Sequence, residues 1–94
     1  MEHIRSIEEL ARWKSGGREK KLGFVPTMGA LHDGHLSLVR LSQSISDRTI
    51  VSIYVNPTQF NKAEDLAAYP DTLEADLHAL EALGCDAVFL PSAQ

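Results

Sequence analysis

The sequence predicts an α/β fold built around a parallel sheet. Patterns typical of helices and of strands alternate along the 94 residues, so that each expected strand is followed by an expected helix before the next strand. A connection through a helix makes neighbouring strands parallel, with a right-handed crossover. No linker-like run or internal repeat divides the chain, and we therefore expect one domain.

The first part of the chain predicts a helix and then a strand. Ser6 and Glu9 have the spacing of a capping box at a helix N-terminus, and the glycine pair that starts at Gly16 ends the helical pattern. The apolar run LGFV, residues 22–25, predicts a buried strand that ends at Pro26.

The middle of the chain predicts a second helix and a second strand. Leu38, Leu41 and Ile45 recur at helical spacing among polar residues, which indicates an amphipathic helix lying on an apolar surface. The β-branched and aromatic run TIVSIYV, residues 49–55, predicts a strand that stops at the Asn-Pro pair after it.

The last part of the chain predicts a third helix and a third strand. Asp71 and Glu74 again have capping-box spacing, and Gly84 stands where a C-terminal helix cap is expected. Residues 87–90 follow as a short apolar run. The expected fold therefore has three parallel strands, each preceded by a helix.

Composition and charge exclude several classes of protein. Nine basic and thirteen acidic residues give a net charge of -4, and no basic run exceeds Lys20 and Lys21, so a nucleic-acid partner is not expected. The single cysteine, Cys85, excludes an intramolecular disulfide and is expected to be a small buried residue. Because the sequence has neither a signal peptide nor an apolar run of about 18 residues, we expect a cytoplasmic protein with no membrane partner.

The segment PTMGALHDGH, residues 26–35, joins the first expected strand to the second expected helix. Ligands of parallel α/β sheets bind at the carboxyl ends of the strands, and a helix N-terminus attracts anions. Gly29 and Gly34 would let the backbone approach a phosphate closely, while His32 and His35 could donate hydrogen bonds to it or transfer a proton. The segment therefore indicates a nucleotide-phosphate site.

Other interpretations of the two histidines stay open at this point. His32 could be a solvated loop residue, and His35 could be a satisfied interior histidine on the same stripe as Leu38. The pair could also bind zinc, but Asp33 is the only further ligand nearby, and a zinc site needs three or four protein ligands. We therefore expect no metal held by protein ligands alone.

The segment after the second expected strand is long for an α/β connection, where about 2 to 6 residues is usual. Asn56 and Gln59 offer neutral donors and acceptors suited to a small hydroxylated acid, and Phe60 could wall such a pocket. The alternatives are simple turn formation by Asn56 and core packing by Phe60.

Two motifs together indicate a family. PTMGALHDGHLSLVR and, further along, YVNPTQF resemble the pantoate–β-alanine ligases (pantothenate synthetases), and the similarity extends through YPDTLEADL and GCDAVFLP. The first motif alone resembles a signature shared by class I aminoacyl-tRNA synthetases and many nucleotidylyltransferases. The second motif, at this distance, is typical of the pantoate enzymes.

The resemblance implies that residues 1–94 form the N-terminal part of a Rossmann-like domain that binds ATP and pantoate, with helices on both faces of its sheet. The implied enzyme joins ATP and (R)-pantoate, with Mg²⁺, to give pantoyl-adenylate and pyrophosphate, and β-alanine then displaces AMP. A homodimer is implied as well. Because the family's chains are much longer, the rest of this domain and a C-terminal domain would lie outside the chain.

The resemblance also implies roles for individual residues. His35 matches the family's proton donor, and His32 matches its partner on the triphosphate. Gln59 matches a glutamine that holds pantoate and serves the β-alanine step. The implied ATP-binding residues are Met28, Gly29, Ala30, Leu31, His32, Asp33, Gly34 and His35. The implied substrate-binding residues are Pro26, Thr27, Asn56, Gln59 and Phe60.

The chain departs from the family pattern in sequence and in length. Asp71 stands where the family usually has arginine, which reverses a charge near the third helix. With half of the catalytic site, the isolated chain is expected to catalyse nothing measurable. The alternative functions are a nucleotidylyltransferase of the same superfamily and a non-catalytic nucleotide-binding fragment.

Overall fold

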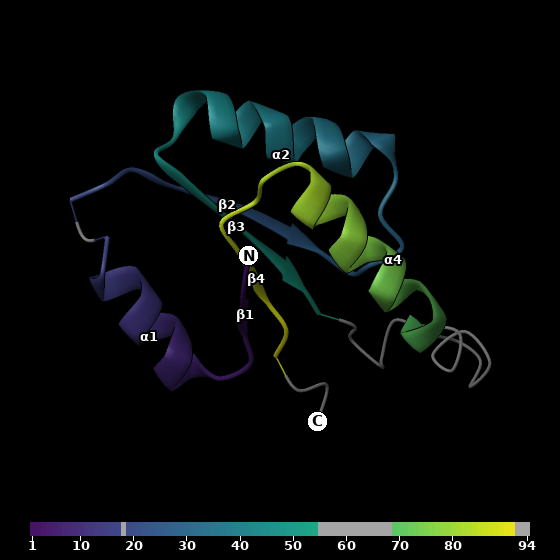
Figure 1. The fold of residues 1–94 in the computed structure, drawn as a ribbon, viewed down its shortest axis with the longest axis horizontal. Helices are drawn as coiled ribbons and strands as arrows, with labels where there is room; N and C mark the ends of the chain where they lie inside the picture. Colours follow the sequence, from purple (N-terminus) through teal and green to yellow (C-terminus); the bar gives the residue numbers. More distant parts are fainter. Residues whose placement is uncertain (18, 55–68, 92–94) are drawn as a thin grey trace.

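The structure is a computed structural model that describes residues 1–17, 19–54 and 69–91. In this part of the chain, four strands form one sheet in the order β1-β4-β3-β2 (Figure 1). All neighbouring strands are parallel, so the predicted α/β class is confirmed. In chain order the elements are β1 (Glu2–Ile4), α1 (Ile7–Ser15), β2 (Leu22–Thr27), α2 (Asp33–Ile45), β3 (Arg48–Ile53), α4 (Tyr69–Ala82) and β4 (Ala87–Phe89).

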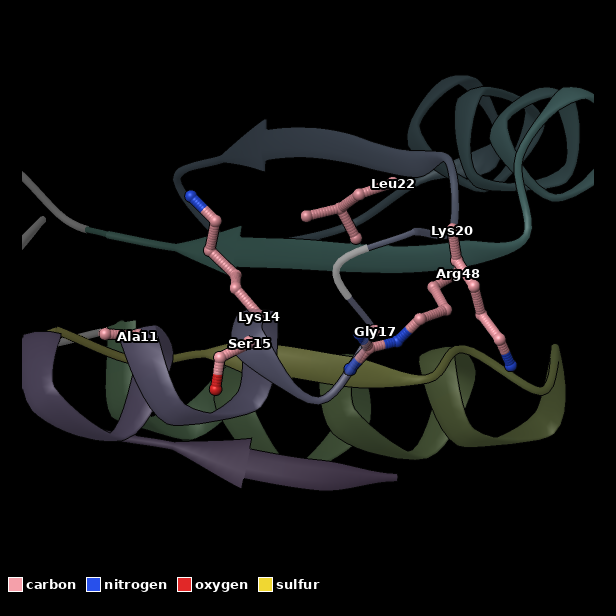
Figure 2. A pocket seen from close by; sticks show the side chains of 7 residues that line it. All are labelled: Ala11, Lys14, Ser15, Gly17, Lys20, Leu22 and Arg48. Atoms are coloured by element: carbon pink, nitrogen blue, oxygen red, sulfur yellow. The ribbon is translucent and has the colours of Figure 1, made fainter.

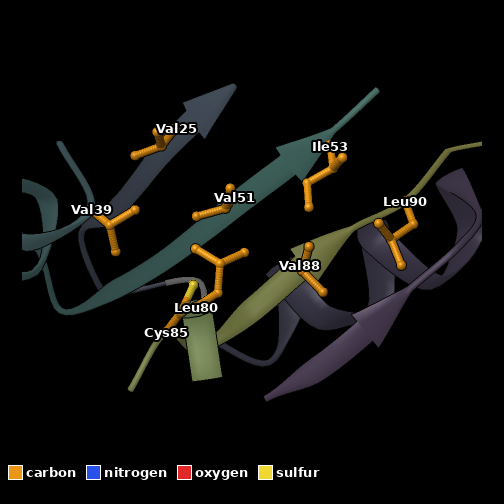
Figure 3. Close-up of a cluster of buried hydrophobic side chains, with 8 residues drawn as sticks. All are labelled: Val25, Val39, Val51, Ile53, Leu80, Cys85, Val88 and Leu90. Carbon is orange, nitrogen blue, oxygen red and sulfur yellow. The ribbon is translucent and has the colours of Figure 1, made fainter. Parts of the chain in front are cut away.

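The larger part of the core lies between the sheet and the helices α2 and α4. Alternate side chains of β2, β3 and β4 point to this face, where Val39 of α2 and Leu80 of α4 meet them (Figure 3). The buried cluster consists of Val25, Val39, Val51, Ile53, Leu80, Cys85, Val88 and Leu90. Burying one such aliphatic side chain contributes about 1.5–3 kcal/mol, so this layer firmly positions the helix that begins at the candidate site.

Helix α1 covers the opposite face of the sheet (Figure 1). Leu10 and Trp13 of this helix pack against a second buried cluster formed by Ile4, Ile50 and Ala87. The central strand β3 is covered from both sides, and its last five residues are buried. This double coverage explains why β3 reads as an unbroken run in sequence and does not alternate between polar and apolar residues.

Strand β1 was not predicted, so the sheet has four strands in the described residues and not three. The strand is only three residues long, and of these Ile4 alone is buried. It pairs with β4, with Ile4 opposite Phe89, and the Ile4 carbonyl accepts a hydrogen bond from the Leu90 amide at 2.7 Å. A strand this short and polar has no recognisable alternation of apolar and polar residues. It becomes a strand because it pairs with β4.

Several predicted boundaries differ from the structure. Strand β2 continues one residue past Pro26. Among the described residues no strand pairs with the outer side of β2, and such an edge tolerates the missing N–H of proline. Helix α4 begins two residues before Asp71, so Asp71 lies inside the helix and is not its N-cap. Strands β3 and β4 end at Ile53 and Phe89, earlier than predicted.

The apolar stripe predicted to bury α2 is exposed beside β2 and is not the face that packs on the sheet. Leu38, Leu41 and Ile45 are 52%, 55% and 61% exposed. The face of α2 that meets the sheet carries Val39 and Ser42. The spacing of the apolar residues therefore correctly predicted an apolar face on this helix. It did not predict that the described sheet would cover a different face.

Candidate functional site

The candidate site lies where β2 ends and α2 begins. Thr27, the last residue of β2, donates its hydroxyl hydrogen to the Ser52 carbonyl at 2.9 Å and accepts the Gly29 amide at 3.2 Å. The Tyr54 amide donates to the Thr27 carbonyl at 3.0 Å. Because its hydroxyl bonds both to Ser52 of β3 and to Gly29 of the loop, Thr27 holds the start of the loop against β3.

The loop between β2 and α2 makes a sharp left-handed turn. Gly29 has a φ of 90° and Ala30 has a φ of 52°. Glycine adopts such angles freely, whereas a residue with a Cβ is disfavoured there by about 1–2 kcal/mol. Two successive residues in this region direct consecutive backbone N–H groups to the same side, which creates a cradle for an anion.

The carboxylate of Asp76 occupies this cradle. Its two oxygens accept the amides of Ala30 and Leu31, each at 2.9 Å. Asp76 belongs to α4 and is buried, with 4% of its surface exposed. Asp76 was not among the predicted site residues, although a carboxylate on the leucine face of the third helix is a signal in itself, because a buried aspartate needs hydrogen-bond partners.

His32 and His35 cap the N-terminus of α2 together. His32 is the N-cap residue, and its ring nitrogen Nδ1 accepts the Gly34 amide at 3.0 Å. The Nδ1 atom of His35 accepts the His32 amide at 3.2 Å. The ring centroids are 4.1 Å apart, and α2 begins at Asp33, between the two histidines.

These hydrogen bonds determine which nitrogen of each ring carries the proton. Only an unprotonated ring nitrogen accepts an amide N–H, so a neutral His32 or His35 carries its proton on Nε2. Each ring thus retains an Nε2–H donor that the cap does not use. His32 is exposed and His35 is half-buried. The start of α2 therefore offers two imidazole donors to an anion.

The remaining predicted site residues are distributed as follows. Pro26, Met28, Ala30, Asp33 and Gly34 are exposed, Thr27 and Gly29 are buried, and Leu31 is half-buried. Asn56, Gln59 and Phe60 lie outside the described residues, so their predicted contacts with a substrate are not tested. The loop at residues 26–35 is thus the described part of the predicted site.

A hollow lies at the end of the strands opposite the candidate loop, where β2 and β3 begin. It has a volume of about 410 Å³ and is lined in part by Lys14, Lys20 and Arg48. Figure 2 shows the side chains of Lys14 and Lys20 ending on opposite sides of this pocket. Arg48 lies 3.5 Å from the Trp13 ring centroid and donates to the Trp13 carbonyl at 3.0 Å. The three positive charges do not converge on one point, so this pocket is not the candidate site.

Across residues 1–17, 19–54 and 69–91, no three His, Cys, Asp or Glu side chains are grouped so that they could hold a metal ion. Within the same residues, no helix is both long enough and apolar enough to cross a membrane.

Residues 2–94 match the family model described as pantoate-beta-alanine ligase. The pantothenate synthetase of Idiomarina loihiensis is 52% identical over 91 residues, which are 97% of this chain and 32% of that protein. The corresponding protein of Halorhodospira halophila is 56% identical over 91 residues, 95% of this chain and 31% of its own length.

Solved structures agree with these sequence matches. The pantoate-beta-alanine ligase of Francisella tularensis, complexed with "Beta-gamma ATP" and β-alanine, is 44% identical with a TM-score of 0.85 and covers 99% of this chain and 36% of its own. The pantothenate synthetase of Thermus thermophilus is 37% identical with a TM-score of 0.76, over 98% and 32% of the two chains. The present chain spans about a third of the length of the relatives it matches. With its fold, its histidine-capped loop and these matches, the chain belongs to the pantoate-beta-alanine ligase family.

Proposed function

We propose that this chain supplies the ATP-phosphate part of a site that ligates (R)-pantoate and β-alanine. The observation that carries the proposal is the pair of capping histidines at the carboxyl edge of the sheet, in a chain of the pantoate-beta-alanine ligase family. A carboxylate oxygen of pantoate attacks the α-phosphorus of ATP, and the bond to pyrophosphate breaks. The amine of β-alanine then attacks the acyl carbon, and AMP leaves.

The two histidines would act on the charge that develops in the first step. Their Nδ1 atoms are occupied by backbone amides, so the free Nε2–H groups are the donors available to phosphate oxygens. Donors already held in place stabilise a developing negative charge without reorganising, and removing one such donor typically costs about 10²–10³ in rate. We assign His35, the less exposed of the two, to the leaving pyrophosphate, to which it would donate a hydrogen bond through Nε2–H. The proton-donor role implied for His35 by the resemblance would require the imidazolium form, whose Nδ1–H could not accept the His32 amide.

The substrate side of the proposed site begins at the end of β3. Asn56, Gln59 and Phe60 follow this strand in sequence, and we assign them to pantoate. The hydroxyl of Thr27 already donates to Ser52, which favours a supporting role for Thr27 beside the substrate. Support for the β-alanine step comes from the Francisella tularensis ligase, whose complex contains β-alanine.

Mg²⁺, a homodimeric assembly and a cytoplasmic location belong to the same proposal. Mg²⁺ is usually bound by substrate phosphates with one or two carboxylates and several waters. The described residues contain no group of three ligands for it, and Asp76 uses both carboxylate oxygens for backbone amides. We therefore assign Mg²⁺ to the phosphates of ATP.

The test is the exchange of labelled pyrophosphate into ATP, with and without (R)-pantoate. It is run on this chain and on the extended polypeptide, meaning the product of the gene read to its full length. We expect exchange that requires pantoate from the extended polypeptide and none from the 94 residues, because the family's proteins are about three times longer than this chain.

His35→Ala in the extended polypeptide is expected to abolish most of the exchange. His78→Ala is the matched control, because His78 is an exposed histidine on α4. Exchange that does not require pantoate would favour a nucleotidylyltransferase. Nucleotide binding without any exchange from either polypeptide would favour a non-catalytic nucleotide-binding module.

A further inference from the structure

Asp76 connects two segments that lie far apart in the sequence. Its oxygens accept the amides of Ala30 and Leu31, which precede it by 46 and 45 residues. The carboxylate is almost completely buried, and burying a carboxylate is costly unless hydrogen bonds replace the lost water. Two charge-assisted bonds of 2.9 Å supply that replacement. The contact is therefore specific: the buried carboxylate needs the two amides as donors, and the two amides use the carboxylate as their acceptor.

The conformation of the loop brings backbone donors together around one acceptor. Gly29 and Ala30 both have positive φ values, and Ala30 bears the steric cost of this conformation. The result is that successive amides converge on one point, where they would repel each other without an acceptor. Asp76 provides the acceptor and so compensates for the strained turn.

Helix α4 is a stable support for this contact. Leu80, one turn further along α4, is fully buried in the main core. Just beyond the C-terminal end of α4, the Gln43 side chain of α2 donates to the Leu83 carbonyl at 2.8 Å. The middle of α4 is thus bonded to the loop before α2, and the residue that follows α4 is bonded to α2. Together these contacts keep Asp76 in a constant position relative to the start of α2.

We propose that Asp76 is a positioning residue for the two histidines. Leu31, whose amide it holds, directly precedes His32, so the place of this amide determines where the cap of α2 begins. Asp76 thereby keeps His32 and His35 in the reciprocal cap that leaves their Nε2–H groups free. It also fills the cradle of the loop, so that phosphate oxygens are directed past Ala30 and Leu31 to the start of α2. Only this last consequence rests on the proposed function.

The test compares Asp76→Asn and Asp76→Ala with Asp47→Asn by NMR of the ¹⁵N-labelled chain. Asp47 is the matched control, because its carboxylate also accepts a backbone amide, that of Lys21 at 2.8 Å. The signals to follow are the ring nitrogens of His32 and His35, which report the tautomer, and the exchange rates of the Ala30 and Leu31 amides.

We expect both Asp76 variants to keep the amide signals of the sheet. Their Ala30 and Leu31 amides should exchange at least tenfold faster, and both rings should lose their single tautomer. Asn, which retains one acceptor oxygen, should have the smaller effect, and Asp47→Asn should have none. If Asp76 had a purely structural role, its substitutions would lower the unfolding temperature but leave the histidine tautomers of the folded chain unchanged. That result would overturn the proposal.

A measurement on the unsubstituted chain covers the case in which a variant does not fold. Scalar coupling across the hydrogen bonds should connect the Ala30 and Leu31 amide nitrogens to the carboxyl carbon of Asp76, and absence of this coupling would overturn the proposal. A separate titration with a non-hydrolysable ATP analogue tests the proposed function. If the unsubstituted chain and the extended polypeptide both fail to bind it, the proposed function is contradicted, while the histidine tautomers still decide the role of Asp76.

Discussion

At the scale of single residues, His32 combines two roles that are usually separate. It is the N-cap of α2 through Nδ1, and in the proposed reaction it is a phosphate donor through Nε2. Histidine is a less common N-cap than Ser, Thr, Asp or Asn. The role as a phosphate donor explains why a histidine stands at this position, because Ser, Thr, Asp and Asn have no N–H donor on a rigid ring.

Two substitutions of His32 should separate these roles. His32→Ala should lower the free energy of unfolding by about 0.5–2 kcal/mol, the usual cost of a lost N-cap, whereas His32→Asn should restore most of it. Both should reduce pyrophosphate exchange in the extended polypeptide at least tenfold. Urea unfolding and the exchange assay provide the two measurements. Full exchange activity in the Asn variant would limit His32 to a structural role.

Cys85 is the small buried residue that the sequence predicted. It is 4% exposed, and its Sγ donates to the Ala87 carbonyl at 3.2 Å. Burial raises the pKa of the Cys85 thiol above its ordinary value, so the folded chain keeps the thiol protonated. In the unfolded chain the thiol ionises at about pH 8.5. The contribution of Cys85 to folding stability should therefore be constant below this pH and decrease above it, because the unfolded state then releases a proton that the folded state retains.

The prediction for Cys85 is a loss of unfolding free energy between pH 7 and pH 9.5. It should be smaller in Cys85→Ala, which lacks the thiol. Urea unfolding at both pH values measures the difference, and a thiol reagent should react with the native protein only after unfolding. Equal pH dependence in the two proteins would show that other groups cause the loss.

At the scale of elements, α2 and β2 approach each other closely at Gly23. A Cβ at this position would overlap the Ser42 side chain and lie 2.6 Å from Ser46 Oγ. Ser42 cannot easily move away, because its hydroxyl shares a buried hydrogen bond of 2.8 Å with Thr49. Because Gly23 has no side chain, α2 can lie close to the sheet at this point. This close approach helps to place the N-terminus of α2 beside the end of β2.

Gly23→Ala should destabilise the chain by about 1–3 kcal/mol, as is usual for overpacking in a filled interior. Gly16→Ala is the control, since a Cβ there would meet its nearest neighbour at an ordinary 3.6 Å and Gly16 has a φ of -70°. Urea unfolding of the two variants should differ clearly. A cost at Gly16 equal to that at Gly23 would contradict the close-packing explanation.

At the scale of the whole molecule, one side of the described structure exposes an apolar surface. Leu38, Leu41 and Ile45 of α2 line a groove of about 400 Å³ together with Val25 and Pro26 of β2. Strand β2 is also an edge strand of the sheet that the described residues form, and unpaired edges and exposed apolar patches both favour association. The 94-residue chain is therefore expected to self-associate at high concentration.

Leu41→Lys should weaken this association, because it places a charge in the middle of the exposed stripe. Light scattering over a range of concentrations measures the effect, with Lys14→Ala on the opposite face as the control. A strictly monomeric chain at high concentration, or equal association of Leu41→Lys and the unsubstituted chain, would contradict the expectation.

The sequence alone determined those features whose signals are local. Ser6 accepts the Glu9 amide at 3.1 Å as the predicted cap of α1, and Gly84 ends α4 with a φ of 77°. The run of β3 predicted a buried strand, and the position of residues 26–35 between β2 and α2 predicted the candidate loop. In each case the deciding interactions lie within a few residues, so the residue types by themselves carry the information.

Only the tertiary structure decided how these elements face one another. Strand β1 exists because β4 pairs with it, and α2 turns Val39 to the sheet and not the predicted leucine stripe. Asp76 reaches the loop across 46 residues of chain. Strand pairing, the coverage of a helix face and buried hydrogen bonds depend on contacts between segments that are far apart in the sequence. The local spacing of apolar residues carries no information about such contacts. For that physical reason the sequence identified the histidines, while the residue that positions them became visible only in the folded chain.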